Sequence, residues 1–338
     1  MRSTDGGGTR NGADRNGYNR DAFLRAYDKV LAKWPADRTS TQVTTPFGVT
    51  YVQVCGPRDA PPLVLLPGGG ATSVSWFAQA GELARSHRVY APDLIGDVGR
   101  SAGDAGRDIA DAGDEARGAG DAGRGTASGE RRIRTVADLT AWLDALLDGL
   151  GVTAGPTALG GHSYGAWIAL HYALHAPARV NRLFLLDPTQ CFAGFRPAYL
   201  LHALPMLLRP APHRVRAFLA WETGGAVLDP DWLALQEAGA GFPAARPVTG
   251  PRPAAEALRG LDVPVLLLLA GNSRTHDPSR VAARAGAVLP RARTVVLPGV
   301  SHHALPHAAP PELGRRIGEF LGGPGVSAGP GESHDPTG

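Results

Sequence analysis

Short apolar runs alternate with amphipathic helical stretches along this chain, and this alternation restricts the fold more than any other feature of the sequence. It predicts an α/β fold with a mostly parallel central sheet and helices on both faces, because parallel strands can be joined only through long crossovers. A helical segment (residues 21–34) and a hairpin (41–54) turned at Pro46-Phe47-Gly48 precede the alternating part. The predicted strands are 62–66, 88–91, 157–159, 182–186, 263–270 and 293–297, and the predicted helices are 135–150, 164–175, 279–288 and 312–321.

The composition is that of a globular chain, since 338 residues with 43% hydrophobic side chains can bury a sizeable core. The net charge is +3 and the basic residues are scattered, so no nucleic-acid-binding face is visible. The first twenty residues lack the apolar stretch of a signal peptide, and no apolar run reaches the ~18 residues that a membrane helix needs. Cys55 and Cys191 have no Cys or His at metal-ligand spacing. We therefore expect a cytoplasmic protein with no metal, nucleic-acid or membrane partner, and the oligomeric state stays open.

Three segments contain too little apolar surface to fold, and we expect disorder at residues 1–20, 101–130 and 322–338. The middle segment repeats Asp-Ala-Gly at Asp104, Asp111 and Asp121. It could be a partner-binding linker. A low-complexity loop insertion on the surface is the favoured interpretation, because lengthening a surface loop adds little closure entropy.

Residues 188–261 interrupt the alternation with helical pieces punctuated by proline. This interval is too long for a simple loop. We expect a helical lid inserted after the sixth strand, which divides the core into residues 21–187 and 262–321. Its apolar side chains would give the binding site an apolar wall, and they are Phe192, Phe195, Tyr199, Leu204, Met206, Leu207 and Trp221.

The motif Gly161-x-Ser163-x-Gly165 lies between a predicted strand and a predicted helix. That context is typical of a nucleophile elbow, a sharp turn that tolerates only small flanking residues and exposes the serine hydroxyl above the sheet edge. The alternative is an ordinary glycine-rich turn whose serine caps the next helix. We predict Ser163 as the nucleophile.

A serine nucleophile needs backbone N–H groups to hold the oxyanion that forms. One donor would be the N–H of Tyr164, and the second would come from the glycine-rich loop after residues 62–66, with Gly69 as the expected donor. A phosphate-binding loop is the alternative, but the Lys-Ser/Thr pair of a P-loop is missing.

The general base should be a histidine after the last strand, because the chain order on this type of sheet is serine, acid, histidine. His302 is the first candidate and His303 the second. A pair of exposed surface histidines is the alternative.

With these motifs the chain resembles the α/β-hydrolase superfamily over roughly residues 22–321. The resemblance is carried by Gly161-His162-Ser163-Tyr164-Gly165, by the segment from Val89 to Ser101 and by the loop Pro298-Gly299-x-x-His302. The variant Asp93-x-Ile95-Gly96-Asp97 and the helical leader are most similar to bacterial carboxylesterases. The resemblance implies carboxylic ester substrates and no cofactor. The chain departs from the family at Pro67, where relatives often have histidine before the oxyanion glycine.

The acid of the triad is a second departure. Relatives usually carry Asp or Glu within two or three residues of the glycine after the seventh strand, and here Gly271 is followed by Asn272, Ser273 and Arg274. Asp277 comes later and has the pattern of a helix N-cap followed by proline. Asp187, at the end of the sixth strand, occupies a place that some relatives use for the acid. Asp187, Asp277 and no acid at all remain open.

The sequence thus indicates a serine hydrolase that cleaves a small-molecule carboxylic ester with an apolar portion through an acyl-enzyme. A non-catalytic ligand-binding protein on the same fold is one alternative, motivated by the missing carboxylate after Gly271. A lyase or cofactor-free oxidoreductase that uses the same residues is another.

Overall fold

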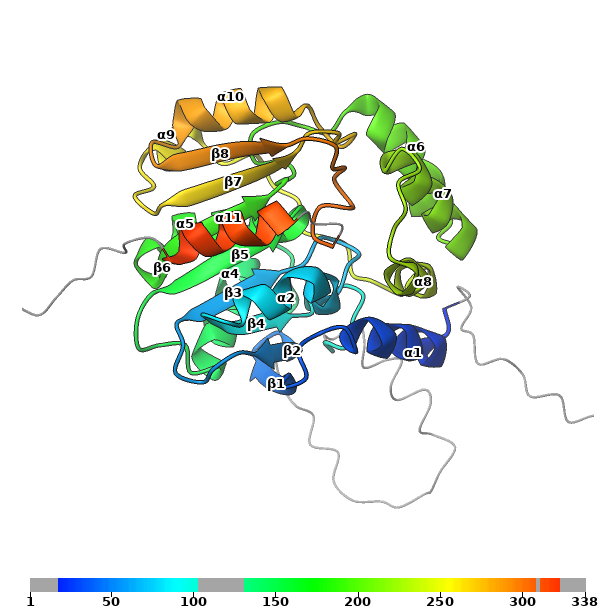
Figure 1. Cartoon of the computed structure of the whole chain (residues 1–338), viewed down its shortest axis with the longest axis horizontal. Coiled ribbons are helices and arrows are strands. Elements are labelled where there is room, and N and C mark those ends of the chain that lie inside the picture. The colour runs from blue at the N-terminus through cyan, green and yellow to red at the C-terminus, as the bar shows by residue number, and fades with distance from the viewer. Residues whose placement is uncertain (1–17, 103–130, 308–310, 323–338) are drawn as a thin grey trace, which may run out of the picture.

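The computed structural model of the chain describes residues 18–102, 131–307 and 311–322. Within these residues eight strands form one sheet in the order β1-β2-β4-β3-β5-β6-β7-β8 (Figure 1). The β1–β2 hairpin and the β2–β4 pair are antiparallel and the remaining pairs are parallel. The strands are β1 (Thr39–Thr45), β2 (Gly48–Cys55), β3 (Pro62–Leu66), β4 (Arg88–Pro92), β5 (Thr157–His162), β6 (Val180–Leu186), β7 (Val265–Ala270) and β8 (Ala292–Leu297).

Helices cover both faces of the sheet (Figure 1). Side chains of α4, α5 and α10 belong to the apolar core on one face, and those of α1, α2 and α11 belong to the core on the other. The helical elements are α1 (Arg20–Leu31), η1 (Ser73–Trp76), α2 (Phe77–Leu83), α4 (Val136–Gly149), α5 (Tyr164–His175), η2 (Pro177–Arg179), α6 (Pro197–Leu208), α7 (Pro212–Glu222), α8 (Pro230–Ala238), α9 (Ala255–Arg259), α10 (Pro278–Val288) and α11 (Pro311–Gly322).

The strand β7 shows why a continuous apolar run predicts a central strand. Leu267 and Leu269 point into one core, whereas Leu266 and Leu268 point into the other, and all four are buried. Successive side chains of a strand face opposite sides, so a strand covered on both sides needs an apolar residue at every position. The predicted fold class is confirmed, and predicted and observed elements agree to within a few residues at their ends.

The interval between β6 and β7 contains α6, α7, α8 and α9. We call residues 188–261 the helical insertion. Figure 1 shows α6, α7 and α8 beside the sheet, at the end where β6 and β7 finish. This placement brings the insertion next to the loops that follow the parallel strands, where ligands of open α/β sheets bind.

The boundaries of two segments expected to be disordered differ from the prediction. Tyr18 is buried and packs edge-on against Phe242 of the helical insertion, so the folded part begins before residue 21. Ser101 is also buried, and Ala102 pairs with Val49, so these two residues belong to the folded part. Gly322, where the third predicted segment begins, is the last residue of α11. The remaining parts of the three predicted segments, residues 1–17, 103–130 and 323–338, lie outside the described residues. None of the described helices is both long and apolar enough to cross a membrane.

Candidate active site

Ser163 lies in the sharp turn between β5 and α5, with φ 55° and ψ −114°. A residue other than glycine rarely adopts a positive φ, so the surrounding packing must hold this turn. A Cβ atom added to Gly161 would lie 2.5 Å from the backbone of Gly165 and Ala166, and one added to Gly165 would lie 2.3 Å from the Pro67 carbonyl oxygen. These close approaches explain why the motif needs glycine on both sides of Ser163.

The glycine-rich loop after β3 lies against this turn. A Cβ atom at Gly68 would be 3.4 Å from the Ser163 Cβ, and one at Gly69 would be 3.5 Å from the Tyr164 Cβ. The Asp97 carboxylate accepts a hydrogen bond from the Gly70 N–H at 2.9 Å, which holds the far end of the loop. Burial raises the pKa of Asp97, and the N–H groups of Gly70 and Val98 oppose this rise. Gly69 and Tyr164, the two expected oxyanion donors, are thus neighbours beside Ser163.

His302 follows β8 and reaches over the sheet edge to Ser163. Its Nε2 lies 2.9 Å from the Ser163 Oγ and its Nδ1 lies 2.7 Å from the Asp187 Oδ2. A carboxylate can only accept, so the His302 Nδ1 donates to Asp187, and this tautomer leaves Nε2 able to accept a hydrogen bond from the Ser163 hydroxyl. His303, the alternative base, points elsewhere, because its Nε2 lies 3.3 Å from the Tyr199 hydroxyl. The structure therefore brings together Ser163, His302 and Asp187.

Asp187 directly follows β6, has φ 42° and is completely buried. Besides His302, its oxygens accept hydrogen bonds from the Ala270 N–H at 3.1 Å, the Ser273 hydroxyl at 2.8 Å and the His276 Nε2 at 2.9 Å. Burial alone would raise the pKa of Asp187, but the hydrogen bonds from His276 and His302 outweigh burial and hold it well below its usual range. Asp187 is therefore an ionised carboxylate that faces two histidines.

Asp277, the other candidate acid, does not face His302. Its carboxylate accepts hydrogen bonds from the N–H groups of Ser279 and Arg280 and caps α10. These N–H groups lower the pKa of Asp277, whose side chain is 49% exposed and lies 3.6 Å from Arg196. The structure thus contradicts Asp277 as the partner of His302, since the N–H groups of α10 hold its carboxylate at the surface.

Sequence reasoning missed His276, Glu222 and the role of His162. His276 lies in the loop after β7, where the family usually places its acid, and donates to Asp187 instead. Glu222 accepts the backbone N–H groups of His302 and His303, each at 3.1 Å. His162, the variable residue of the serine motif, lies 3.0 Å from the His302 carbonyl oxygen through its Nε2. No spacing in the sequence predicts these contacts, because they join segments that are far apart in the chain.

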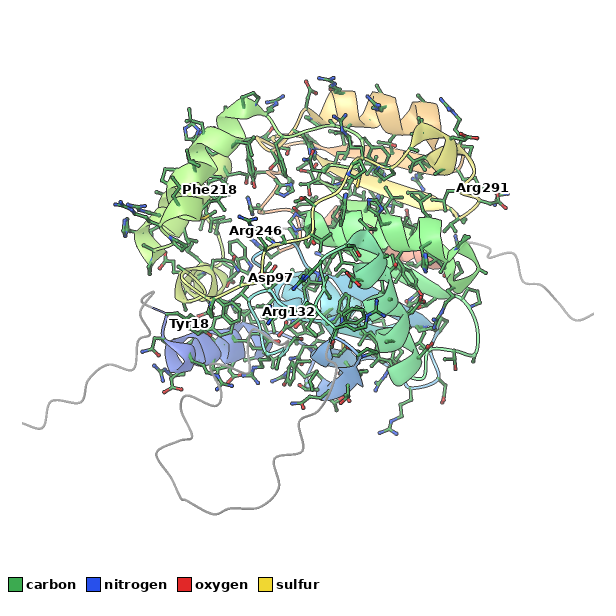
Figure 2. The ribbon with its side chains drawn as sticks, turned by 180° about the vertical axis from the view of Figure 1, so that it is seen from behind. Tyr18, Asp97, Arg132, Phe218, Arg246 and Arg291 are labelled. Carbon is green, nitrogen blue, oxygen red and sulfur yellow. The ribbon has the colours of Figure 1, made fainter. Side chains whose placement is uncertain are left out.

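Ser163 opens onto a pocket of about 290 Å³ between the sheet edge and the helical insertion. Figure 2 labels Phe218 on α7 and Asp97 in the loop after β4, two lining residues from distant parts of the chain. Among the side chains that the sequence suggested for this wall, Met206 and Leu207 line the pocket, but Phe192 is buried in the core and Leu204 is 45% exposed. The larger apolar side chains of the lining, apart from alanine and proline, are Val98, Met206, Leu207, Val215, Phe218, Leu219, Trp232 and Phe242.

Among the described residues no group of three or more His, Cys, Asp or Glu side chains is arranged to hold a metal ion. The histidines near Ser163 instead form hydrogen bonds with protein groups. His276 and His302 contact the Asp187 carboxylate, His302 also contacts the Ser163 hydroxyl, and His162 contacts the His302 carbonyl oxygen.

Comparison with known proteins identifies relatives that cover most of this chain. Carboxylesterase YbfK of Bacillus subtilis (strain 168) is 26% identical over 316 residues, which cover 89% of this chain and 94% of the relative. The crystal structure of that carboxylesterase covers 89% of this chain and 98% of its own, with a TM-score of 0.74 and 25% identity. The crystal structure of naproxen esterase from Bacillus subtilis covers 91% of this chain and 99% of its own, with a TM-score of 0.75 and 27% identity.

The model of the alpha/beta hydrolase family matches residues 63–315, which include Ser163, Asp187 and His302. This match and the strand order described above agree, and the chain belongs to the alpha/beta hydrolase family.

Proposed function

We propose that this protein is a serine hydrolase that cleaves carboxylic esters with an apolar portion through an acyl-enzyme intermediate. The observation that carries the proposal is the continuous hydrogen-bonded chain from the Ser163 Oγ through His302 to the buried Asp187. Ser163 lines a pocket together with Gly68, Gly69 and Gly70 of the glycine-rich loop after β3, so an ester carbonyl can approach the hydroxyl there. The similarity to bacterial carboxylesterases supports the same substrate class.

In this proposal, His302 Nε2 accepts the Ser163 proton as the Oγ attacks the ester carbonyl carbon. Asp187 holds the imidazole in the required tautomer and stabilises the positive charge that His302 acquires. The N–H groups of Gly69 and Tyr164 hold the oxyanion, and His302 returns the proton to the leaving alkoxide. Water activated by His302 then attacks the acyl-enzyme and releases the acid.

The pocket supports an apolar substrate portion. Aromatic and aliphatic side chains from α6, α7 and α8 line it, among them Leu207, Phe218 and Trp232. Burying apolar substrate surface against such a wall contributes about 25 cal/mol per Å². An ester with an aromatic or branched group should therefore bind better than a short linear one.

Ser163→Ala tests the proposal directly. The variant should lose at least about 10⁴-fold in kcat on a p-nitrophenyl ester and should no longer react with a fluorophosphonate, because the nucleophile is gone. Its melting temperature should stay close to that of the parent, since alanine fits the turn. Ser279→Ala, an exposed serine on α10, is the matched control and should keep full activity. Ester turnover of the Ser163→Ala variant at the parental rate would refute a serine mechanism.

A further inference from the structure

Glu222 is the last residue of α7 and is only 1% exposed. Burying a carboxylate is costly unless donors surround it, and the C-terminal end of a helix is the less favourable end for a negative charge. Among the described residues Glu222 forms no ion pair. A side chain that served only to pack α7 on the core would be apolar, so this carboxylate needs another explanation.

Its contacts supply that explanation. Glu222 Oε1 accepts the N–H of His302 at 3.1 Å, and Oε2 accepts the N–H of His303 at 3.1 Å. The Arg274 N–H lies 3.5 Å from Oε1. The two oxygens thus bind the N–H groups of the two consecutive peptide units that flank His302, and they define the orientation of its backbone on both sides of the Cα atom.

The carbonyl group of His302 is also held by a hydrogen bond. His162 Nε2 lies 3.0 Å from the His302 carbonyl oxygen. The backbone of His302 is therefore bound at its N–H by Glu222 of the helical insertion and at its C=O by His162 at the end of β5. The imidazole must meet Asp187 at 2.7 Å and Ser163 at 2.9 Å at the same time, which leaves little tolerance for movement of this backbone.

We propose that Glu222 is a positioning residue that orients the base His302 from the helical insertion, so that the insertion is part of the catalytic machinery as well as a pocket wall. This inference rests on the proposed hydrolase function. Glu222 acts through the backbone of His302 and touches neither substrate nor the reacting atoms.

The test compares Glu222→Gln with the parent and with Glu237→Gln. A glutamine has the same shape, but its NH₂ group faces one of the two N–H groups, so one hydrogen bond is replaced by a repulsive contact. We expect kcat and the rate constant of fluorophosphonate labelling to fall together by about 10–100-fold, while KM changes less than about threefold. Glu237, which pairs with Arg216, lies on α8 of the same insertion, and its glutamine variant should match the parent.

A second variant and a second signal separate positioning from stability. Glu222→Asp keeps both acceptor oxygens on a shorter side chain and should recover part of the lost rate. The proton NMR resonance of the His302 Nδ1–H bonded to Asp187 should shift in Glu222→Gln and return toward its parental position in Glu222→Asp. This resonance reports the position of the base even if the substrate is unsuitable.

The proposal is overturned if Glu222→Gln labels at the parental rate and keeps the parental resonance. It is also overturned if the loss of activity equals the loss of folded protein, so that fewer molecules react but each reacts as fast as the parent. A parent that does not react with fluorophosphonate would instead refute the proposed hydrolase function, and the resonance would still decide the role of Glu222.

Discussion

Asp187 and Asp277 show how the same side chain takes different roles in different surroundings. Asp187 is completely buried and accepts hydrogen bonds from His302 and His276. Asp277 is half exposed and accepts N–H groups at the start of α10. Only the first arrangement can orient an imidazole and stabilise its positive charge.

The two isosteric changes Asp187→Asn and Asp277→Asn should therefore have very different effects on kcat. Asp187→Asn should reduce kcat by roughly 10³–10⁴-fold, because the charge that stabilises imidazolium is lost and the tautomer of His302 is no longer defined. Asp277→Asn should keep its activity, since asparagine also caps helices well. Turnover per folded molecule, with folding followed by circular dichroism, measures both effects. An inactive Asp277→Asn variant beside an active Asp187→Asn variant would contradict our assignment of the acid.

Among the elements, α1 shows how a helix at the start of the folded chain is tied to the loops around the site. The Tyr27 hydroxyl of α1 lies 2.9 Å from the Ser73 Oγ and 3.2 Å from the buried Asp93 carboxylate. Asp93 also accepts the N–H groups of Ser73 and Arg100, each at 2.7 Å. Burial raises the pKa of Asp93, and these donors oppose the rise. Asp93 thus joins α1, η1 and the loop after β4.

Tyr27→Phe tests this connection. The change removes one donor from Asp93 and leaves the ring in place, so it should cost about 1–3 kcal/mol of the free energy of unfolding without changing kcat. Tyr90→Phe, at a half-buried tyrosine on β4, is the control and should lower the free energy of unfolding by less. Urea unfolding of both variants gives the comparison. Equal stability of Tyr27→Phe and the parent would show that α1 is held by its apolar face alone.

Across the whole molecule, several histidines are enclosed by apolar surroundings on folding. Burial lowers the pKa of His303 to about 4 and that of His307 to about 3, and it lowers the pKa of His162 well below its usual value. The unfolded chain therefore binds more protons than the folded one once the pH falls below about 6.5. Stability should be fully present above that pH and should decrease as the pH falls toward the pKa values of the folded state.

We expect a loss of about 2 kcal/mol at pH 5 for each fully buried histidine, from the difference of about 1.5 pH units below the unfolded pKa. The melting temperature should therefore fall between pH 7 and pH 5. His307→Phe removes one such group beside Phe77 and Trp232, and it should make the fall smaller. His213→Gln, an exposed histidine on α7, is the control and should leave the fall unchanged. A melting temperature that is constant over this range would contradict the sign of these shifts.

Local patterns in the sequence were sufficient for the fold and for part of the site. The apolar run of β7 predicts a strand buried on both faces, and glycines at 161 and 165 predict a turn that exposes Ser163. Each of these features depends on residues that are close together in the chain, whose steric limits can be read from residue type. The order of Ser163 before His302 follows in the same way from the order of strands and loops.

Only the tertiary structure shows which carboxylate contacts His302 and which residues hold its backbone. Asp187 meets His302 because β6 lies beside β5 and β7 in the sheet and because its backbone adopts φ 42°. Glu222 reaches His302 only because the helical insertion lies beside the end of the sheet where the parallel strands finish. These contacts depend on distances between segments that are far apart in sequence, and residue spacing carries no information about such distances. The sequence by itself therefore determined the fold, the serine turn and the candidate base, while packing decided which carboxylates surround that base.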